Sequence, residues 1–189
     1  LGANAEQYGT INRYIGENAL DGQADFVLYH AVVDRVFIHQ EKDYHHLDYW
    51  TARSQDQYVQ PSIMVPYVGS HDVPRFISRA DTGTSDAYNQ WLDQGLPGQP
   101  GQVGPYEAAL QAYTWLLTTP GAPLLYQGDE YGEYGGADPD NRHMWRDQNQ
   151  WNENERNLWD SISEIGKIRL ESEALRRGEY ISVYQDADA

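Results

Sequence analysis

Two short apolar runs, residues 63–68 and 122–126, are each followed by a loop rich in glycine and acidic residues. Buried parallel strands have this nearly continuous apolar character, because helices cover both of their faces. Apolar residues at helical spacing lie between the runs, over residues 105–117, and again over residues 158–168. Strands that alternate with helices indicate a parallel α/β fold, in which functional residues gather just after the carboxyl ends of the strands. Pro66 conflicts with a central strand, because it has no N–H to donate.

Weaker patterns predict the remaining elements. Residues 25–29 are an apolar run after a turn signal and are predicted as a buried strand. Helical spacing begins over residues 31–37, and residues 44–57 form a polar, aromatic-rich helix or loop. Glycine and proline predict a loop over residues 91–105, and residues 180–184 alternate like a strand with one exposed face.

Composition narrows the classes of function. The 189 residues suit one domain, and their formal net charge of −16 argues against nucleic acids and anionic membranes as partners. The chain has no cysteine and no stretch near the ~20 apolar residues of a membrane span. Tyrosine (15) and tryptophan (6) far outnumber phenylalanine (3), and rings with a polar group suit sugars. The chain starts without Met or a signal peptide, so we expect a beginning inside a longer protein and infer no localisation.

The two loops after the apolar runs carry the candidate functional residues. His71 and Asp72 can hydrogen-bond a diol and place a negative charge beside a developing cation, although such a pair also serves as a loop cap. The second loop, over residues 127–146, combines carboxylates and glycines with Arg142 and Arg146. A calcium loop would also need closely spaced oxygens, but the usual order of calcium ligands is absent.

The same two segments resemble motifs of the α-amylase superfamily, glycoside hydrolase family thirteen. Residues 69–76 (GSHDVPRF) resemble the Asn-His-Asp motif of the penultimate barrel strand and its Pro-Arg-Phe tail, with serine replacing asparagine at position 70. Residues 121–130 (GAPLLYQGDE) resemble the last strand, and residues 136–142 (GADPDNR) resemble the loop after it. Residues 20–29 (LDGQADFVLY) are similar to the sixth strand, so the resemblance covers nearly the whole chain.

The resemblance implies the C-terminal half of a (β/α)₈ barrel. Residues 1–178 would run from the end of strand five through helix eight, and residues 179–189 would start a C-terminal β-domain. It further implies a retaining hydrolase or transglycosylase that acts on α-1,4 and α-1,6 glucosidic bonds of α-glucans or maltooligosaccharides. Asp72 is then the carboxylate that stabilises the transition state. By the same resemblance, His71, Asp138 and Arg142 would contact the sugar.

The family's nucleophilic aspartate and general acid glutamate precede the matched region. Retaining chemistry needs two carboxyl groups ~5–5.5 Å apart. If residues 1–3 end the fifth strand, Ala3 occupies the position of the acid, and Glu6 is the other candidate. We therefore expect this chain alone to be inactive and to need the N-terminal half of the barrel as its partner. We expect no cofactor in this chain, and calcium is an option only in the parent enzyme.

A different class of function stays open: a non-catalytic carbohydrate-binding or assembly protein with a degenerate amylase-like barrel. The histidines at positions 39, 45 and 46 lack the spacing of a zinc site, and we expect no metal there. Most of the tryptophans are expected in the core. Trp91, in the glycine- and proline-rich loop, is the best candidate for a sugar platform.

Overall fold

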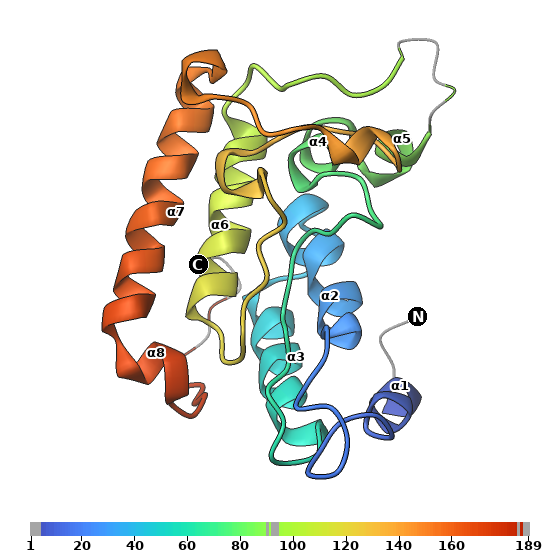
Figure 1. The fold of residues 1–189 in the computed structure, drawn as a ribbon, viewed down its shortest axis with the longest axis vertical. Coiled ribbons are helices and arrows are strands. Elements are labelled where there is room, and N and C mark those ends of the chain that lie inside the picture. The colour runs from blue at the N-terminus through green and yellow to red at the C-terminus, as the bar shows by residue number, and fades with distance from the viewer. Residues whose placement is uncertain (1–4, 90, 92–94, 185, 187–189) are drawn as a thin grey trace.

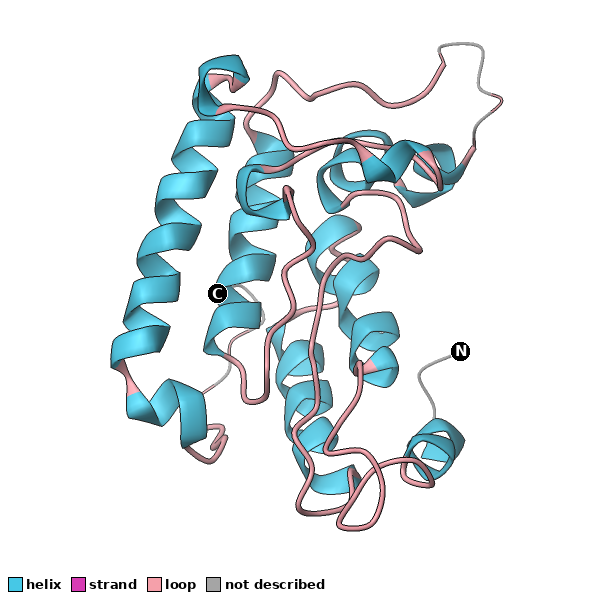
Figure 2. Ribbon diagram, viewed as in Figure 1, coloured by secondary structure: helices cyan, strands magenta, loops and turns pink. Residues whose placement is uncertain are grey.

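The computed structural model describes residues 5–89, 91, 95–184 and 186 (Figure 1). Helices dominate this part of the chain, as Figure 2 shows. The α-helices are α1 (Ala5–Ile11), α2 (Phe26–Val32), α3 (Tyr44–Gln57), α4 (Phe76–Thr82), α5 (Thr84–Tyr88), α6 (Gly104–Thr118), α7 (Glu153–Glu171) and α8 (Glu173–Arg177). A π-helical segment continues α2 over Val33–Ile38, and short 3₁₀ turns cover Asp129–Tyr131, Asp140–Arg142 and Gln148–Gln150.

Three extended segments, residues 21–25, 63–67 and 122–124, lie side by side and run parallel. The amide of Asp25 donates to the carbonyl of Val65 at 2.9 Å, and the amide of Leu124 donates to the carbonyl of Pro66 at 2.9 Å. Pro66 has no N–H to donate. The hydrogen bonds between the second and third segments are therefore donated by amides of the third segment. The pairing forms isolated bridges, and no regular strand is present within the described residues.

The predicted strand over residues 25–29 is wrong, because these residues enter helix α2. The carboxylate of Asp25 accepts a hydrogen bond from the amide of Leu28 at 3.0 Å and so begins the helix. Val27, Leu28 and Val32 are buried at helical spacing. A short apolar run does not distinguish a strand from a buried helix, and the extended chain precedes it, over residues 21–25.

Two helix predictions are confirmed, since residues 105–117 lie within α6 and residues 158–168 lie within α7. Residues 44–57, for which the sequence left a helix and a loop open, form α3. The last helix breaks at Ser172, which caps α8 through a bond from the amide of Leu175. Arg169 of α7 donates to the carbonyls that end α6 and to Gly121 at 2.7 Å, so it fixes the start of the third segment.

The predicted strand over residues 180–184 is not observed, since these residues lie outside helices and strands. A strand needs a neighbour to satisfy its backbone groups, and Ile181, Val183 and Tyr184 are largely exposed. The domain boundary at residue 179 and the C-terminal β-domain stay predictions, and residues 185 and 187–189 lie outside the described part.

Side chains of α2, α3, α4, α6 and α7 form the main core together with Tyr67 and Val68, which end the second segment. Helices α6 and α7 pack side by side (Figure 1). None of the helices described is long and apolar enough to cross a membrane. The loops that follow Val68 and Leu125 leave the core at the carboxyl ends of the second and third segments.

Candidate active site

His71 and Asp72 lie in the loop after the second segment, as predicted. Their side chains are 58% and 71% exposed, and Nε2 of His71 is 3.2 Å from Oδ1 of Asp72. The amide of Asp72 donates to the hydroxyl of Ser70 at 3.2 Å. The pair is therefore open to solvent and able to contact a ligand, while Ser70 shapes the backbone behind it.

Asp138 and Arg142 lie in the loop after the third segment. Oδ1 of Asp138 is 2.6 Å from Nε of Arg142, and both side chains are about half exposed. Such an exposed pair orients the two groups but contributes little to stability. The guanidinium of Arg142 also reaches to within 3.5 Å of the carbonyl of His71. The fold thus brings the four predicted residues to one end of the extended segments.

Asn141 joins the two loops. Its amide nitrogen donates to the carbonyl of His71 at 2.9 Å and to the carbonyl of Val73 at 2.8 Å. Its side chain is fully buried, so these bonds are shielded from water and hold the backbone on both sides of Asp72. Asn141 lies within the motif of residues 136–142, but the sequence alone predicts no role for it.

The buried side chain of Arg75 hydrogen-bonds residues of the second loop from its own position after the first loop. Its guanidinium donates to the carbonyls of Asn141 (2.8 Å) and Gln127 (2.7 Å) and to Oδ1 of Asp129 (2.9 Å). The guanidinium carbon also lies 4.1 Å from the ring centroid of Tyr126. Arg75 is 1% exposed, so its planar guanidinium is a buried group that hydrogen-bonds residues far apart in the sequence.

Asp129 is the buried anion that holds Arg75. Burial raises the pKa of Asp129, whereas Arg75 and the hydroxyl of Tyr113, which donates at 2.7 Å, lower it. Gly69 lies directly against this carboxylate. A Cβ at Gly69 would be 2.6 Å from Oδ2 of Asp129, so a larger residue there would displace the anion.

Arg146, which the sequence grouped with Arg142, does not contact the exposed Asp138–Arg142 ion pair in the described structure. It is bound by Glu133 at 2.7 Å and by Glu155, both of which are buried. Two residues were predicted for the position of the general acid, and an alanine there would mean that the acid is absent. Ala3 lies outside the described residues, and Glu6 falls in α1 with its side chain outside the described part.

No group of three or more potential ligands that could hold a metal ion occurs among the described residues. In the loop weighed as a calcium site, Asp138 pairs with Arg142, and Asp140 binds the amide of Gly136 (2.6 Å) and His143. These carboxylates are therefore already matched with donors. Trp91 is 90% exposed, in line with a platform, whereas Trp151 is buried.

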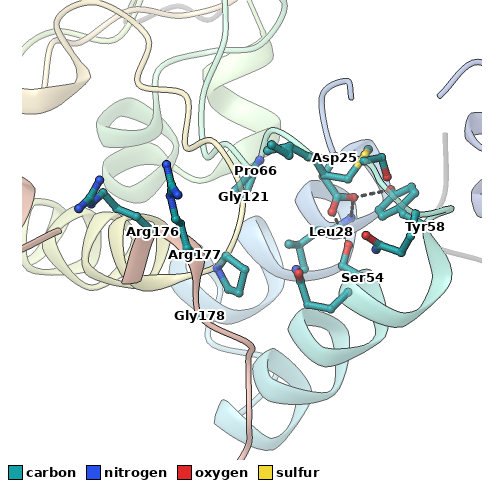
Figure 3. A pocket seen from close by; sticks show the side chains of 15 residues that line it. Asp25, Leu28, Ser54, Tyr58, Pro66, Gly121, Arg176, Arg177 and Gly178 are labelled. Carbon is teal, nitrogen blue, oxygen red and sulfur yellow. Dashed lines mark hydrogen bonds between the residues drawn. The ribbon is translucent and has the colours of Figure 1, made fainter. Parts of the chain in front are cut away.

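A separate cavity of about 270 Å³ lies where the second and third segments begin (Figure 3). Asp25, Ser54 and Tyr58 line one side of it, and Arg177 lines the other. Asp25 accepts hydrogen bonds from Ser54 and, at 2.7 Å, from Tyr58, and burial raises the pKa of Asp25. Since reactive residues in α/β barrels lie at the carboxyl ends of strands, the cavity is not the predicted site.

Known proteins are similar to this chain in sequence or in structure. No family model matches. The chain is 26% identical to an amylopullulanase of Thermoanaerobacter thermohydrosulfuricus and 29% identical to a β/α-amylase of Paenibacillus polymyxa, over 97% and 87% of its length. It spans 12% of the length of each of these relatives.

One solved structure with the same fold is the cyclic α-maltosyl-(1→6)-maltose hydrolase of Arthrobacter globiformis in complex with cyclic α-maltosyl-(1→6)-maltose. Its superposition on this chain gives a TM-score of 0.75 at 24% sequence identity. The matched region covers 95% of this chain and 36% of the hydrolase chain. This chain therefore corresponds to about a third of the fold of that hydrolase.

Proposed function

We propose, from the premise that this chain is a relative of the α-amylase-type glycoside hydrolases, that it supplies part of an active site for α-glucans. The parent protein would hydrolyse or transfer α-1,4 and α-1,6 glucosidic bonds with retention. The observation that carries the proposal is the Asn141 bridge, which brings the His71–Asp72 loop to the Asp138–Arg142 loop. The named activities of the relatives support the choice of α-glucan as the substrate class.

Asp72 is the proposed transition-state stabiliser. Its exposed carboxylate would attract the positive charge that develops on the sugar ring. His71, which contacts Asp72, would hydrogen-bond a neighbouring hydroxyl group of the same sugar. The nucleophile would come from the part of the barrel that precedes strand six. Glu6 would supply the general acid if it occupies the acid position, and the acid would be missing if Ala3 occupies it.

Asp138 and Arg142 are proposed to bind a sugar unit on the non-reducing side of the cleaved bond. Their ion pair orients both groups before the substrate arrives, which lowers the entropy cost of binding. Contacts away from the cleaved bond position the substrate for reaction. Residues 1–178 would complete a barrel with an N-terminal half, and residues 179–189 would start a β-domain.

The test uses the intact protein and measures the release of reducing ends from maltooligosaccharides. Asp72→Asn is expected to lower kcat by on the order of 10²-fold or more, with a small change in KM, because the lost charge acts in the transition state. Asp160→Asn, on the exposed face of α7, is the matched control and should keep normal kcat. His71→Ala should reduce both rate and affinity.

Two results would overturn the proposal. One is near-normal kcat in Asp72→Asn. The other is an intact wild-type protein that binds maltooligosaccharides but does not turn them over, together with an Arg142→Ala variant that no longer binds them. The second result would identify a carbohydrate-binding protein with an amylase-like barrel.

A further inference from the structure

The imidazole of His143 lies between two carboxylates. Nδ1 is 3.1 Å from Oε1 of Glu133, and Nε2 is 3.2 Å from Oδ1 of Asp140. A neutral imidazole has one N–H, and an ionised carboxylate can only accept a hydrogen bond. Both contacts are therefore hydrogen bonds only when the ring carries two N–H groups, as an imidazolium.

The carboxylate of Glu133, which contacts His143, has further partners. Glu133 is 1% exposed and also binds Arg146 at 2.7 Å and the hydroxyl of Tyr131 at 2.8 Å. Arg146 in turn binds Glu155. The imidazole thus contacts the carboxylates of Glu133 and Asp140, and Arg146 is the cation bound to Glu133.

The remaining neighbours of His143 fix its position without adding charge. The ring of Tyr134 packs edge-on against the imidazole at 4.7 Å between centroids, and the side chain of Gln127 donates to the carbonyl of His143 at 3.0 Å. The imidazole is 28% exposed, so protons can reach it. Arg142, the residue before it, is engaged with Asp138.

Asp140 connects this imidazole to the sugar-binding loop. Its second oxygen accepts a hydrogen bond from the amide of Gly136 at 2.6 Å, and Asp140 itself begins the turn Asp140–Arg142. His143 therefore joins Asp140, at the centre of the loop, to Glu133, which is anchored in the buried network. When the ring has a single N–H, one of the two carboxylates loses its donor.

We propose that His143 is a positioning residue: its imidazolium bridges Glu133 and Asp140 and holds the loop that carries Asp138 and Arg142 in the sugar-binding arrangement. Loss of the proton loosens the loop, so the grip on the distal sugar weakens as pH rises. The inference deepens the proposed function and rests on it for the identity of the ligand. The loop motion itself does not depend on catalysis.

The experiment follows amide hydrogen exchange of residues 135–143 in the intact protein between about pH 5 and 8, the interval in which imidazoles change charge. Rates are corrected for the intrinsic pH dependence of exchange. In the wild type, these amides should exchange about tenfold faster at the alkaline end, because a charge-assisted contact is lost. His143→Gln should exchange fast throughout, with no step.

Two further variants separate positioning from general structural damage. His45→Gln, on the exposed side of α3, should keep the wild-type step. His143→Arg, which donates from several nitrogens at every pH in the interval, should remain slow without a step. A wild type without a step, or a His143→Gln variant that keeps one, would overturn the proposal.

Activity gives a second and separate readout. The kcat/KM ratio between long and maltose-sized substrates should fall with rising pH in the wild type and be independent of pH in His143→Gln. If the intact protein showed no turnover, the proposed function would fail while the exchange step persisted. If turnover were normal and the step absent, only the role of His143 would be refuted.

Discussion

Replacement of Arg75 by methionine tests whether the buried guanidinium holds the site together. The change keeps an apolar chain of similar length and removes the partner of Asp129 and the donors to the carbonyls of Asn141 and Gln127. Loss of one member of a buried ion pair costs about 3–5 kcal/mol. Each carbonyl left unsatisfied adds about 1–3 kcal/mol.

These contributions are not additive, because Tyr113 still donates to Asp129 and water can enter the space. A loss of about 4–6 kcal/mol in the free energy of unfolding is therefore expected, against a total of about 5–15 kcal/mol for typical domains. The loss should be smaller in acid. Without Arg75 the pKa of Asp129, already raised by burial, rises further, so the folded variant binds a proton more tightly than the unfolded chain. The stability this supplies is present at low pH and disappears as pH rises through the folded pKa.

The assay is urea unfolding of the intact protein, followed by tryptophan fluorescence at pH 5 and pH 7. Arg142→Met removes an arginine from an exposed pair and serves as the control, with an expected loss of about 0–1 kcal/mol. The double variant Arg75→Met, Asp129→Leu should recover part of the stability, because no buried charge is left unpaired. Equal losses in Arg75→Met and Arg142→Met would refute the reasoning.

Three further predictions concern the two loops and the cavity. Arg142→Ala should lower kcat/KM more on long oligosaccharides than on maltose-sized ones; an equal loss at all lengths would indicate that the Asp138 pair only stiffens the loop. Ser70→Asn should keep kcat/KM within about an order of magnitude, since it restores the motif's usual amide; abolished activity would show that the backbone requires the hydroxyl that binds the Asp72 amide. Burial raises the pKa of Asp25 from 3.8, so the wild type should lose stability in urea melts as pH rises from there through the raised value. Asp25→Asn should remove that slope, and an unchanged slope would assign it to other carboxyl groups.

The sequence predicted those features that depend on local periodicity. Apolar residues recur at helical spacing over residues 105–117, which lie within α6. The loops with His71, Asp72, Asp138 and Arg142 were predicted from their place after apolar runs, which the parallel pairing of residues 63–67 with 122–124 explains. The strand predicted over 25–29 failed because burial on a helix and burial on a strand require the same residue types.

The connecting residues could not be predicted in the same way. Arg75 and Asn141 are polar, and polar side chains in a loop are ordinarily exposed. Their burial depends on contacts with residues more than fifty positions away, such as Gln127 and His71. Arg146 was grouped with Arg142 because the two are close in sequence, whereas buried Glu133 and Glu155 bind it elsewhere. Such pairings follow from tertiary packing and leave no periodic pattern.

The link between Arg75 and Asn141 also sets an order in time during synthesis of the chain. The two residues are 66 positions apart, and at about 5–20 residues per second a ribosome needs about 3–13 s to make the intervening segment. Until Gln127 and Asp129 are made, 52 and 54 positions after Arg75, the helices from α2 to α4 can pack locally, but the guanidinium of Arg75 has none of these partners. The backbone around Asp72 therefore receives the hydrogen bonds from Asn141 only after this later loop is made.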